Sequence, residues 1–341
     1  MAKSLRLTAE VLELRTRHPF IIARGGQSDY RTVWVKLTDA EGNEGWGEAA
    51  PTKFYGETAE TVLAALGVYA AALPSDPFAL EATERALLAA MGGNAAARVA
   101  ISTALHDLVA KRAGVPLWKY WGLDAARAPR STFTIGIDTI EKMRDKVREA
   151  SEYPILKVKL GTDRDVEILS TLRDATDREI RVDANCAWTA RQAIRMLPVL
   201  DEFGVTVLEQ PVAPTDLDGF LEIRRRSSVP VIADESCRTA ADIPPLVGRV
   251  DGVNLKLAKL GSLREALRAI AVARAHHLQV MLGCMIESSI GITAAAHVAP
   301  LVDIVDLDGA ALLANDPFKG ATIDGGQLTL PTAPGLGVTR R

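Results

Sequence analysis

Three carboxylates stand at regular intervals in the middle of the chain. Asp183, Glu209 and Asp234 each close a run rich in β-branched residues, and gaps of 26 and 25 residues separate them. Brought together, their charges repel unless one carboxyl has a raised pKa or a divalent cation binds all three. Oxygen ligands with no histidine or thiolate pattern nearby favour Mg²⁺, or else Mn²⁺, over zinc. In the alternative interpretation each carboxylate only caps a helix or pairs with an arginine, which explains one of them more readily than three.

Lysines flank these carboxylates along the sequence. Lys157 and Lys159, in LKVKLG, stand at i and i+2 of one run and so point to the same side. Their mutual repulsion, together with a nearby dication, would lower the pKa of a lysine and make it a base at neutral pH. Lys256 closes a later run, and we expect it to face Lys159 across the site. A base on each face of a carbon next to a metal-bound carboxylate suits racemisation or epimerisation through an enediolate.

The segment after Pro129 would position these side chains. It alternates short β-branched runs with amphipathic helical patterns, which predicts an α/β fold with parallel strands joined by helical crossovers. The runs begin at residues 131, 155, 179, 204, 229, 251, 278 and 302. Eight such runs favour a closed barrel of the TIM type, with an open doubly wound sheet as the alternative. Polar residues close seven runs, so we expect them to form a ring at the carboxyl face, where active sites of such barrels lie.

The first third of the chain has a different pattern. Antiparallel strands are predicted at 5–14, 31–37 and 44–48. Alanine and leucine at helical spacing follow, from Glu57 to about Gly114, so this part is α+β. We therefore expect the first third to form an α+β region of its own, ahead of the barrel.

Composition excludes several classes of partner. The 341 residues include 40 Lys and Arg against 43 Asp and Glu, which gives no chain-wide attraction to nucleic acid or to an anionic membrane. No uncharged apolar run reaches the roughly 18 residues of a membrane span, and the start lacks an apolar signal-peptide core. Cys186, Cys237 and Cys284 lie in separate segments, which disfavours a disulfide framework and predicts a cytoplasmic protein. A homo-oligomer is compatible with these features.

The site residues together resemble the enolase superfamily, in its muconate-lactonising subgroup. The shared features are the KxK motif at Lys157 and Lys159, the Asp, Glu and Asp ligands, and Lys256 on the sixth barrel strand. The resemblance covers essentially the whole chain. It implies an α+β capping domain over 1–120, a modified (β/α)7β barrel over 121–315 and a tail over 316–341 that returns to the cap. It implies Lys159 and Lys256 as the two bases, and a lysine base with Mg²⁺ and an enediolate is the general pattern of that superfamily.

Two further segments, LGCMIESSIG at 282–291 and DLDGA at 306–310, are similar to dipeptide epimerases of the L-Ala-D/L-Glu type. The resemblance implies that Asp306 and Asp308 hold the free α-ammonium of a dipeptide, a charge assignment that their i and i+2 spacing allows. An Asx turn after the last strand is the other interpretation of DLDG. The resemblance also implies substrate contacts from Lys157, at the substrate carboxylate, and from Thr132, Cys284 and Ile286 along the dipeptide.

The cap would select the substrate side chain. Arg24 precedes Gly25 and Gly26 in a predicted loop between two strands, where glycine permits a moving lid. The resemblance suggests that Arg24 reads an acidic side chain, although Asp29 could equally meet a cationic or neutral one. The segment TKFYGET at 52–58 is a second predicted lid.

These features predict a Mg²⁺-dependent epimerase that inverts the α-carbon of the C-terminal residue of an L-Ala-X dipeptide, with Glu or Asp suggested for X. Within the superfamily, the alternatives are a muconate cycloisomerase, an o-succinylbenzoate synthase and an N-succinylamino acid racemase. Their substrates lack a free ammonium, which leaves Asp306 and Asp308 poorly explained. Outside it, the alternative is a non-catalytic metal- or ligand-binding barrel, in which Lys159 and Lys256 would be incidental.

Overall fold

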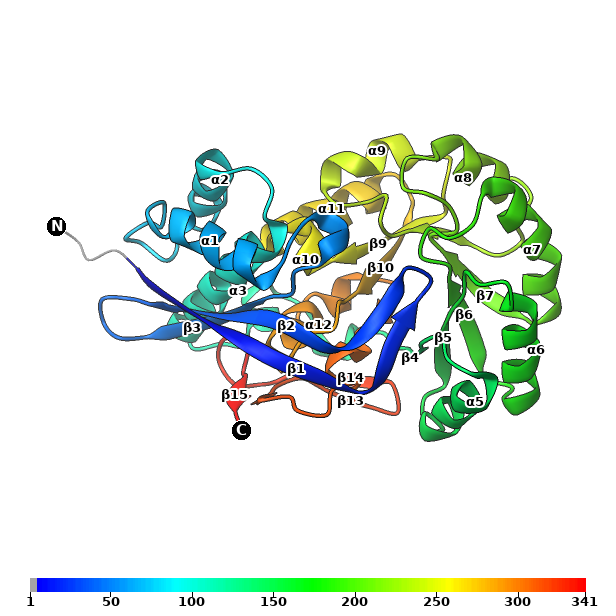
Figure 1. The fold of residues 1–341 in the computed structure, drawn as a ribbon. Helices are drawn as coiled ribbons and strands as arrows, with labels where there is room; N and C mark the ends of the chain where they lie inside the picture. Colours follow the sequence, from blue (N-terminus) through cyan, green and yellow to red (C-terminus); the bar gives the residue numbers. More distant parts are fainter. Residues whose placement is uncertain (1–4) are drawn as a thin grey trace.

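The computed structural model describes residues 5–341. Residues 1–4, where the stretch tested for a signal peptide and the expected capping domain both begin, lie outside this range. The described chain forms an antiparallel sheet with helices at one end and an eight-stranded parallel sheet at the other (Figure 1). No helix among the described residues combines the length and the apolar composition that a membrane crossing requires.

The N-terminal part is a three-stranded sheet packed on helices. Its strands are β1 (Arg6–Ile22), β2 (Gly25–Thr38) and β3 (Glu44–Ala49), and its helices are α1 (Ala59–Ala70), α2 (Leu80–Ala90) and α3 (Ala95–Arg112). Helix α3 lies directly against β3, where a Cβ on Gly47 would approach the carbonyl oxygen of Ala100 to 2.0 Å. Glycine is therefore required for this close packing.

Strands β1 and β2 form a longer hairpin than the sequence predicted. The predictions ended the first strand at residue 14 and began the second at residue 31, but the pairing runs to Ile22 and resumes at Gly25. Most of the extension is exposed, so it follows backbone pairing instead of an apolar pattern. Figure 1 shows this hairpin reaching from the cap to the barrel strands. Arg24 lies at its tip, between the end of β1 and the start of β2, and contacts the barrel residues Asn185 and Glu235.

The parallel strands form a closed barrel in chain order. They are β4 (Phe133–Ile135), β5 (Ile155–Lys159), β6 (Glu179–Asp183), β7 (Val205–Glu209), β8 (Val231–Ala233), β9 (Gly252–Lys256), β10 (Gln279–Gly283) and β11 (Ile304–Asp306). A parallel bridge between Ser131 and Val305 joins the first and last strands, and the Thr132 N–H donates to the Val305 carbonyl at 3.2 Å. The predicted closed barrel is confirmed, and the open sheet is excluded.

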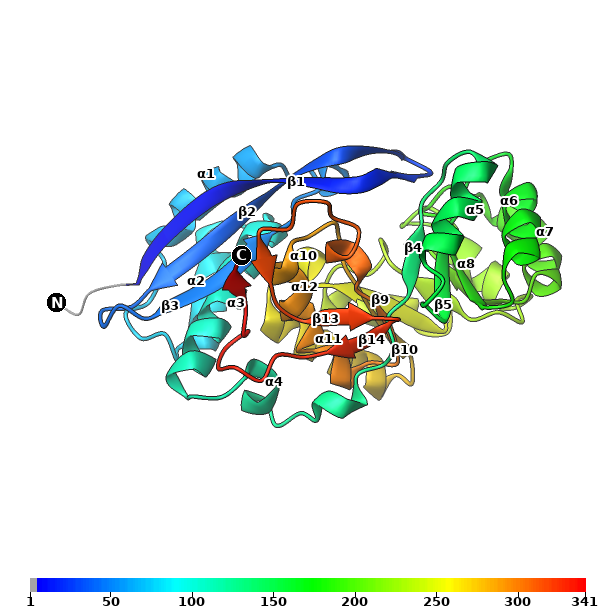
Figure 2. The same cartoon turned by 90° about the horizontal axis from the view of Figure 1, so that it is seen from below.

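Helices connect successive strands on the outside of the barrel (Figures 1 and 2). They are α5 (Ile140–Glu149), α6 (Asp165–Ala175), α7 (Ala190–Glu202), α8 (Leu217–Arg224), α9 (Ile243–Leu246), α10 (Leu257–Leu260), α11 (Leu263–Ala275) and α12 (Ser289–Ala296). Strand β11 is followed by the short 3-10 turn η5 (Asp308–Ala310). The topology is thus (β/α)7β, as predicted.

The C-terminal segment returns to the cap. It forms β12 (Phe318–Lys319), β13 (Thr322–Asp324), β14 (Gln327–Thr329) and β15 (Thr339–Arg340). The Phe318 ring packs edge-on against Trp34 of β2, with ring centroids 5.2 Å apart. After α3, the short helix α4 (Leu117–Tyr120) also meets the tail, because the Leu117 N–H donates to the Gly335 carbonyl at 2.8 Å. In Figure 2 the C-terminus lies beside β2 and α3.

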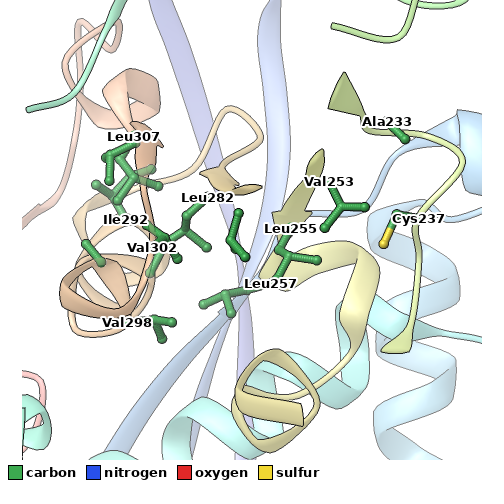
Figure 3. Close-up of a cluster of buried hydrophobic side chains, with 14 of the residues drawn as sticks. Ala233, Cys237, Val253, Leu255, Leu257, Leu282, Ile292, Val298, Val302 and Leu307 are labelled. Atoms are coloured by element: carbon green, nitrogen blue, oxygen red, sulfur yellow. The ribbon is translucent and has the colours of Figure 1, made fainter. Parts of the chain in front are cut away.

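The apolar core between the strands and the outer helices fixes the orientation of the polar side chains. Val253 and Leu255 of β9 belong to the buried cluster of Figure 3, together with Leu257 of α10 and Leu282 of β10. Because side chains alternate along a strand, the intervening Asn254 and the terminal Lys256 point to the opposite face, into the barrel. The same alternation directs the other polar strand ends inward.

Candidate active site

The strand register brings the polar strand ends to one level. Lys159 pairs with Asp183 across β5 and β6, and Asp183 pairs with Glu209 across β6 and β7. On the other side of the barrel, Gly283 of β10 lies between Lys256 and Asp306. These side chains therefore gather at the carboxyl face, as the spacing predicted.

Asp183, Glu209 and Asp234 form a compact carboxylate cluster. One oxygen from each residue lies within 4.8 Å of those of the other two. All three residues are at most 1% exposed. Three converging carboxylate oxygens are the hard donor set that Mg²⁺ and Mn²⁺ prefer, so the residues fit a divalent cation.

Buried lysines surround this carboxylate cluster. The Lys157 Nζ lies 2.7 Å from Glu209 Oε2 and 3.2 Å from Asp183 Oδ2, and the Lys159 Nζ lies 2.6 Å from Asp183 Oδ2. Lys256 Nζ donates to Asp234 Oδ2 at 2.7 Å. Because β5 and β9 are four strands apart in an eight-stranded barrel, Lys159 and Lys256 approach the carboxylates from opposite sides.

Neighbouring charges shift the pKa values of the carboxylates in different directions. Burial opposes ionisation of Asp183, but the ammonium groups of Lys159, Lys157 and Lys256 together lower the pKa of Asp183. Burial and then repulsion from Asp183 raise the pKa of Glu209 to about 8. For Asp234, the ammonium groups of Lys256 and Lys259 overcome burial and lower its pKa. Glu209 is thus the least acidic of the three carboxyl groups.

Carboxylates hold the lysines of the site and raise the pKa values of two of them. Burial alone would lower the pKa of Lys157, but the carboxylates of Asp306 and Glu209 raise it well above its ordinary value. Burial is likewise outweighed at Lys256, where Asp234 raises the pKa. The predicted lowering of a lysine pKa depended on a nearby dication as well as on repulsion between lysines, so it stays a prediction.

Asp306 is the last residue of β11, and Asp308 begins η5 two residues later. The Lys157 Nζ donates to Asp306 Oδ2 at 2.7 Å, and the Thr132 hydroxyl donates to the other oxygen. The Thr134 N–H donates to Asp308 Oδ2 at 2.6 Å. Burial and the neighbouring Asp306 raise the pKa of Asp308 to about 7. Burial also opposes ionisation of Asp306, but Lys157, Lys159 and the Thr132 hydroxyl together lower its pKa.

One cavity of about 820 Å³ is lined both by lysines of the site and by the acidic pair Asp306 and Asp308. Its wall includes most of the predicted site residues: Arg24, Lys157, Lys159, Asp234, Lys256, Cys284, Ile286, Asp306 and Asp308. Thr132 is fully buried and acts on Asp306 instead of lining the cavity, whereas Thr134 lines it. Asp183 and Glu209 are not among the lining residues within the described range 5–341.

The cap closes over the cavity through Arg24. Its Nη2 donates to Glu235 Oε1 at 2.8 Å, and its Nη1 donates to the carbonyl oxygen of Asn185 at 2.5 Å. The guanidinium also lies over the ring of Phe54, 4.2 Å from the ring centroid, in the second predicted lid. Arg24 therefore joins the hairpin tip, the segment at 52–58 and the barrel. Asp29 lines the same cavity but forms an exposed ion pair with Arg15 at 2.6 Å.

Sequence reasoning missed three residues that contact this site. Lys259 donates to the carboxylate of Asp234, and Glu235 and Asn185 hold Arg24. Asn185 also adopts a positive φ of 45°, which is uncommon outside glycine. The one sequence signal that could have identified these three residues was their position, since each lies within three residues of a predicted metal ligand or base.

Comparison with known proteins agrees with this geometry. The model of the mandelate racemase / muconate lactonizing enzyme N-terminal domain matches residues 6–122, and the enolase C-terminal domain-like model matches residues 139–341. The chain therefore belongs to the mandelate racemase / muconate lactonizing enzyme family of the enolase superfamily, as the resemblance implied.

Several relatives are named as epimerases of dipeptides. The chain is 41% identical to an L-Ala-D/L-Glu epimerase of Bacteroides thetaiotaomicron over 98% of this chain and 88% of that protein. It is 32% identical, with a TM-score of 0.93 and 99% coverage of both chains, to a dipeptide epimerase of Enterococcus faecalis complexed with Mg and L-Leu-L-Tyr. A Cytophaga hutchinsonii dipeptide epimerase complexed with Mg and D-Ala-L-Val superposes with a TM-score of 0.94 at 29% identity, covering 99% of this chain and 96% of that one.

Proposed function

We propose that this protein is a Mg²⁺-dependent dipeptide epimerase that inverts the α-carbon of the C-terminal residue of an L-Ala-X dipeptide. One observation supports this most strongly. Lys159 and Lys256 enter a single cavity from opposite sides of a buried carboxylate cluster, and the acidic pair Asp306 and Asp308 lines the same cavity.

The two lysines would move the proton. One lysine accepts the α-proton at its Nζ while the C–H electron pair stays on the substrate as an enediolate. The other donates a proton from its Nζ to the opposite face, which inverts the configuration. Asp183 and Asp234 hold these two ammonium groups at 2.6 and 2.7 Å, so the basicity of each lysine depends on what else those carboxylates bind.

The metal would be held by Asp183, Glu209 and Asp234. When bound, a divalent cation supplies positive charge that stabilises the negative charge developing on the substrate carboxylate. Lys157 lies between Glu209 and Asp306, so its ammonium would contact the same carboxylate and help to orient it. Mg²⁺ is favoured because the cluster consists of oxygen donors and because Mg is present in the complexes of the relatives.

The acidic pair would bind the free α-ammonium of the dipeptide. Asp308 has a carboxylate in the cavity wall, and Lys157, which favours its ionised form, is shared with three other carboxylates. An ammonium placed there would favour the ionised form of Asp308, because opposite charge lowers a carboxyl pKa. Substrates of the other subgroup reactions lack this ammonium. Cys284 and Ile286 would line the dipeptide between its two ends.

The side chain of the second residue would meet Arg24. Acidic side chains suit its guanidinium, but Glu235 already engages one of its nitrogens, so an acidic side chain must share Arg24 with Glu235. The relatives differ here, since their names and ligands include Glu, Tyr and Val at the second position. We propose Glu or Asp at this position, with residues 1–120 and 316–341 selecting the side chain and residues 121–315 supplying the chemistry.

A dipeptide screen tests this function. L,L-dipeptide pools are incubated in deuterated water with Mg²⁺, and mass spectrometry identifies substrates because epimerisation introduces one deuterium at the α-carbon. L-Ala-L-Glu or L-Ala-L-Asp should gain deuterium first. No incorporation across the pool, with Mg²⁺ still bound, would instead support a non-catalytic binding barrel, and incorporation only into N-acylated amino acids would support a racemase.

Cellular location and assembly remain predictions. The three cysteines among the described residues are free thiols, in keeping with the cytoplasmic location that we propose. Sedimentation analysis of the purified protein would measure whether it forms a homo-oligomer.

A further inference from the structure

Lys259 is a fourth buried lysine beside the carboxylate cluster, and the proton transfer described above does not use it. Its Nζ donates to Asp234 Oδ1 at 2.5 Å, to the Asp234 carbonyl oxygen at 2.5 Å and to the Asn254 carbonyl oxygen at 2.8 Å. Its side chain is 0% exposed. All three N–H groups of the ammonium therefore have acceptors, and the side chain ties the end of β8 to β9.

Lys259 differs from the other three lysines in its position. Lys157, Lys159 and Lys256 line the cavity, whereas Lys259 is not among its lining residues within the described range 5–341. A substrate in the cavity can therefore reach those three but not Lys259. Any effect of Lys259 on the reaction has to act through Asp234.

The local sequence accounts for this position. Lys256 ends β9, and the single turn of α10 places Lys259 three residues later on the same side of the chain. Gly261 then ends the turn with a φ of 84°, a left-handed conformation that glycine adopts without strain. The two lysines consequently reach different oxygens of Asp234, Oδ2 and Oδ1.

Each carboxylate of the cluster accepts a hydrogen bond from a donor other than the three cavity-lining lysines. The Asn185 N–H donates to Asp183 Oδ1 at 2.8 Å, and the Asn254 amide donates to Glu209 Oε1 at 2.8 Å. For Asp234 this donor is the charged Lys259, which binds its main chain as well as its side chain. Lys256 donates to the other oxygen of the Asp234 carboxylate but must be free to exchange a proton. Among the donors to this carboxylate in the described residues, Lys259 is therefore the one that can hold it throughout a cycle.

We propose that Lys259 is a positioning residue that fixes the carboxylate of Asp234 for cation binding. This inference rests on the proposed metal-dependent function. Partners that hold a metal ligand in place typically contribute about 10- to 100-fold to metal affinity. Loss of the Lys259 ammonium should therefore weaken cation binding, although it removes a positive charge that by itself opposes a cation.

The test measures binding of Mn²⁺ alone. Free Mn²⁺ is followed by electron paramagnetic resonance during titration of the parent protein and of Lys259→Met, and the rise in melting temperature with Mg²⁺ gives a second reading. We expect Lys259→Met to bind Mn²⁺ roughly 10- to 100-fold more weakly. Lys259→Arg, which keeps the charge and several donors, should recover part of that loss.

Lys146 provides the matched control. It is also a buried lysine, 6% exposed, and it pairs with Asp138 at 3.0 Å near helix α5, away from the carboxylate cluster. Lys146→Met should bind Mn²⁺ like the parent protein. If Lys259→Met does not fold, Lys259→Gln and Lys259→Arg replace it, with the weaker binding expected for Gln.

The possible results separate the two proposals. Parent-like or tighter Mn²⁺ binding by folded Lys259→Met, even with a lower melting temperature, would overturn the positioning role and leave Lys259 purely structural. A parent protein that binds no Mn²⁺ would instead overturn the proposed metal-dependent function.

Discussion

The barrel mouth and the lid over it are built in opposite ways. At the mouth, Asp183, Glu209 and Asp234 are at most 1% exposed, and each accepts a hydrogen bond from a second donor in addition to its contact with a cavity-lining lysine. In the lid, Arg24 has a side chain 32% exposed and Phe54 is 42% exposed. Buried charges with several partners are held rigidly, whereas an exposed pair is screened by solvent and easily rearranged. The mouth therefore suits chemistry, and the lid suits the choice of substrate.

The largest effect should follow from removing a lysine of the mouth. Lys159→Ala and Lys256→Ala should each lower epimerisation by about 10²- to 10⁴-fold, the range for a general acid or base. Mass spectrometry of α-proton exchange in deuterated water measures this directly. The assignment of bases would be wrong if Lys159→Ala exchanged the α-proton of an L,L substrate as fast as the parent.

A smaller loss is expected at the acidic pair. Asp308→Asn should lower kcat/KM for a free dipeptide by roughly 30-fold, corresponding to about 2 kcal/mol for removing one partner of a buried charge pair. Initial rates on L-Ala-L-Glu and on its N-acetyl derivative make the comparison. An equal loss on both substrates would show that Asp308 does not bind the ammonium.

The interface between cap and barrel should show a pH-dependent stability. Burial and then the carboxylate of Glu48 raise the pKa of Glu287 to about 8, from an ordinary value of 4.5. Between these values the folded protein keeps a proton that the unfolded chain has lost, so this contribution to stability is present at low pH and disappears as the pH rises toward 8. Relative to Glu287→Gln, the parent should lose about 1 kcal/mol or more of unfolding free energy between pH 5 and pH 8.

Urea denaturation at the two pH values measures that difference. Glu10 is exposed on β1, so Glu10→Gln should follow the parent and serves as the control. A parallel pH response of Glu287→Gln and the parent would show that Glu287 does not keep its proton in the folded state.

The smallest effect should come from the lid. Arg24→Met should reduce kcat/KM for L-Ala-L-Glu relative to L-Ala-L-Gln by about fivefold, corresponding to about 1 kcal/mol for a partly exposed pair. The rate of α-proton exchange on dipeptides with a small second residue should be nearly unchanged in Arg24→Met. Arg112→Met removes an ion-paired arginine of the cap, 34% exposed, whose partner Asp39 is not among the cavity-lining residues of the described range, and it should not alter the preference. A gain on acidic dipeptides in Arg24→Met would reverse the proposed role of Arg24.

Much of the fold was predictable because its signals are local. The β-branched runs and their polar last residues depend on strand alternation, which lies in consecutive residues, and the closed barrel and the family resemblance were both confirmed. The length of the β1–β2 hairpin was not predictable in this way, because its exposed extension is paired through backbone groups that every residue has.

The contacts of the site depended on tertiary structure for a related reason. The sequence placed Asp183, Glu209, Asp234 and the lysines on successive strand ends, since one β/α unit has a nearly constant length. It could not assign Lys259 to Asp234, Glu235 to Arg24 or Thr132 to Asp306, because these partners are separated by 25, 211 and 174 residues. Nor could it give the direction of the lysine pKa shifts, which depends on the carboxylates that folding places within about 3 Å. Residue types and their order define the chemistry available, and only the closed barrel determines which charges meet.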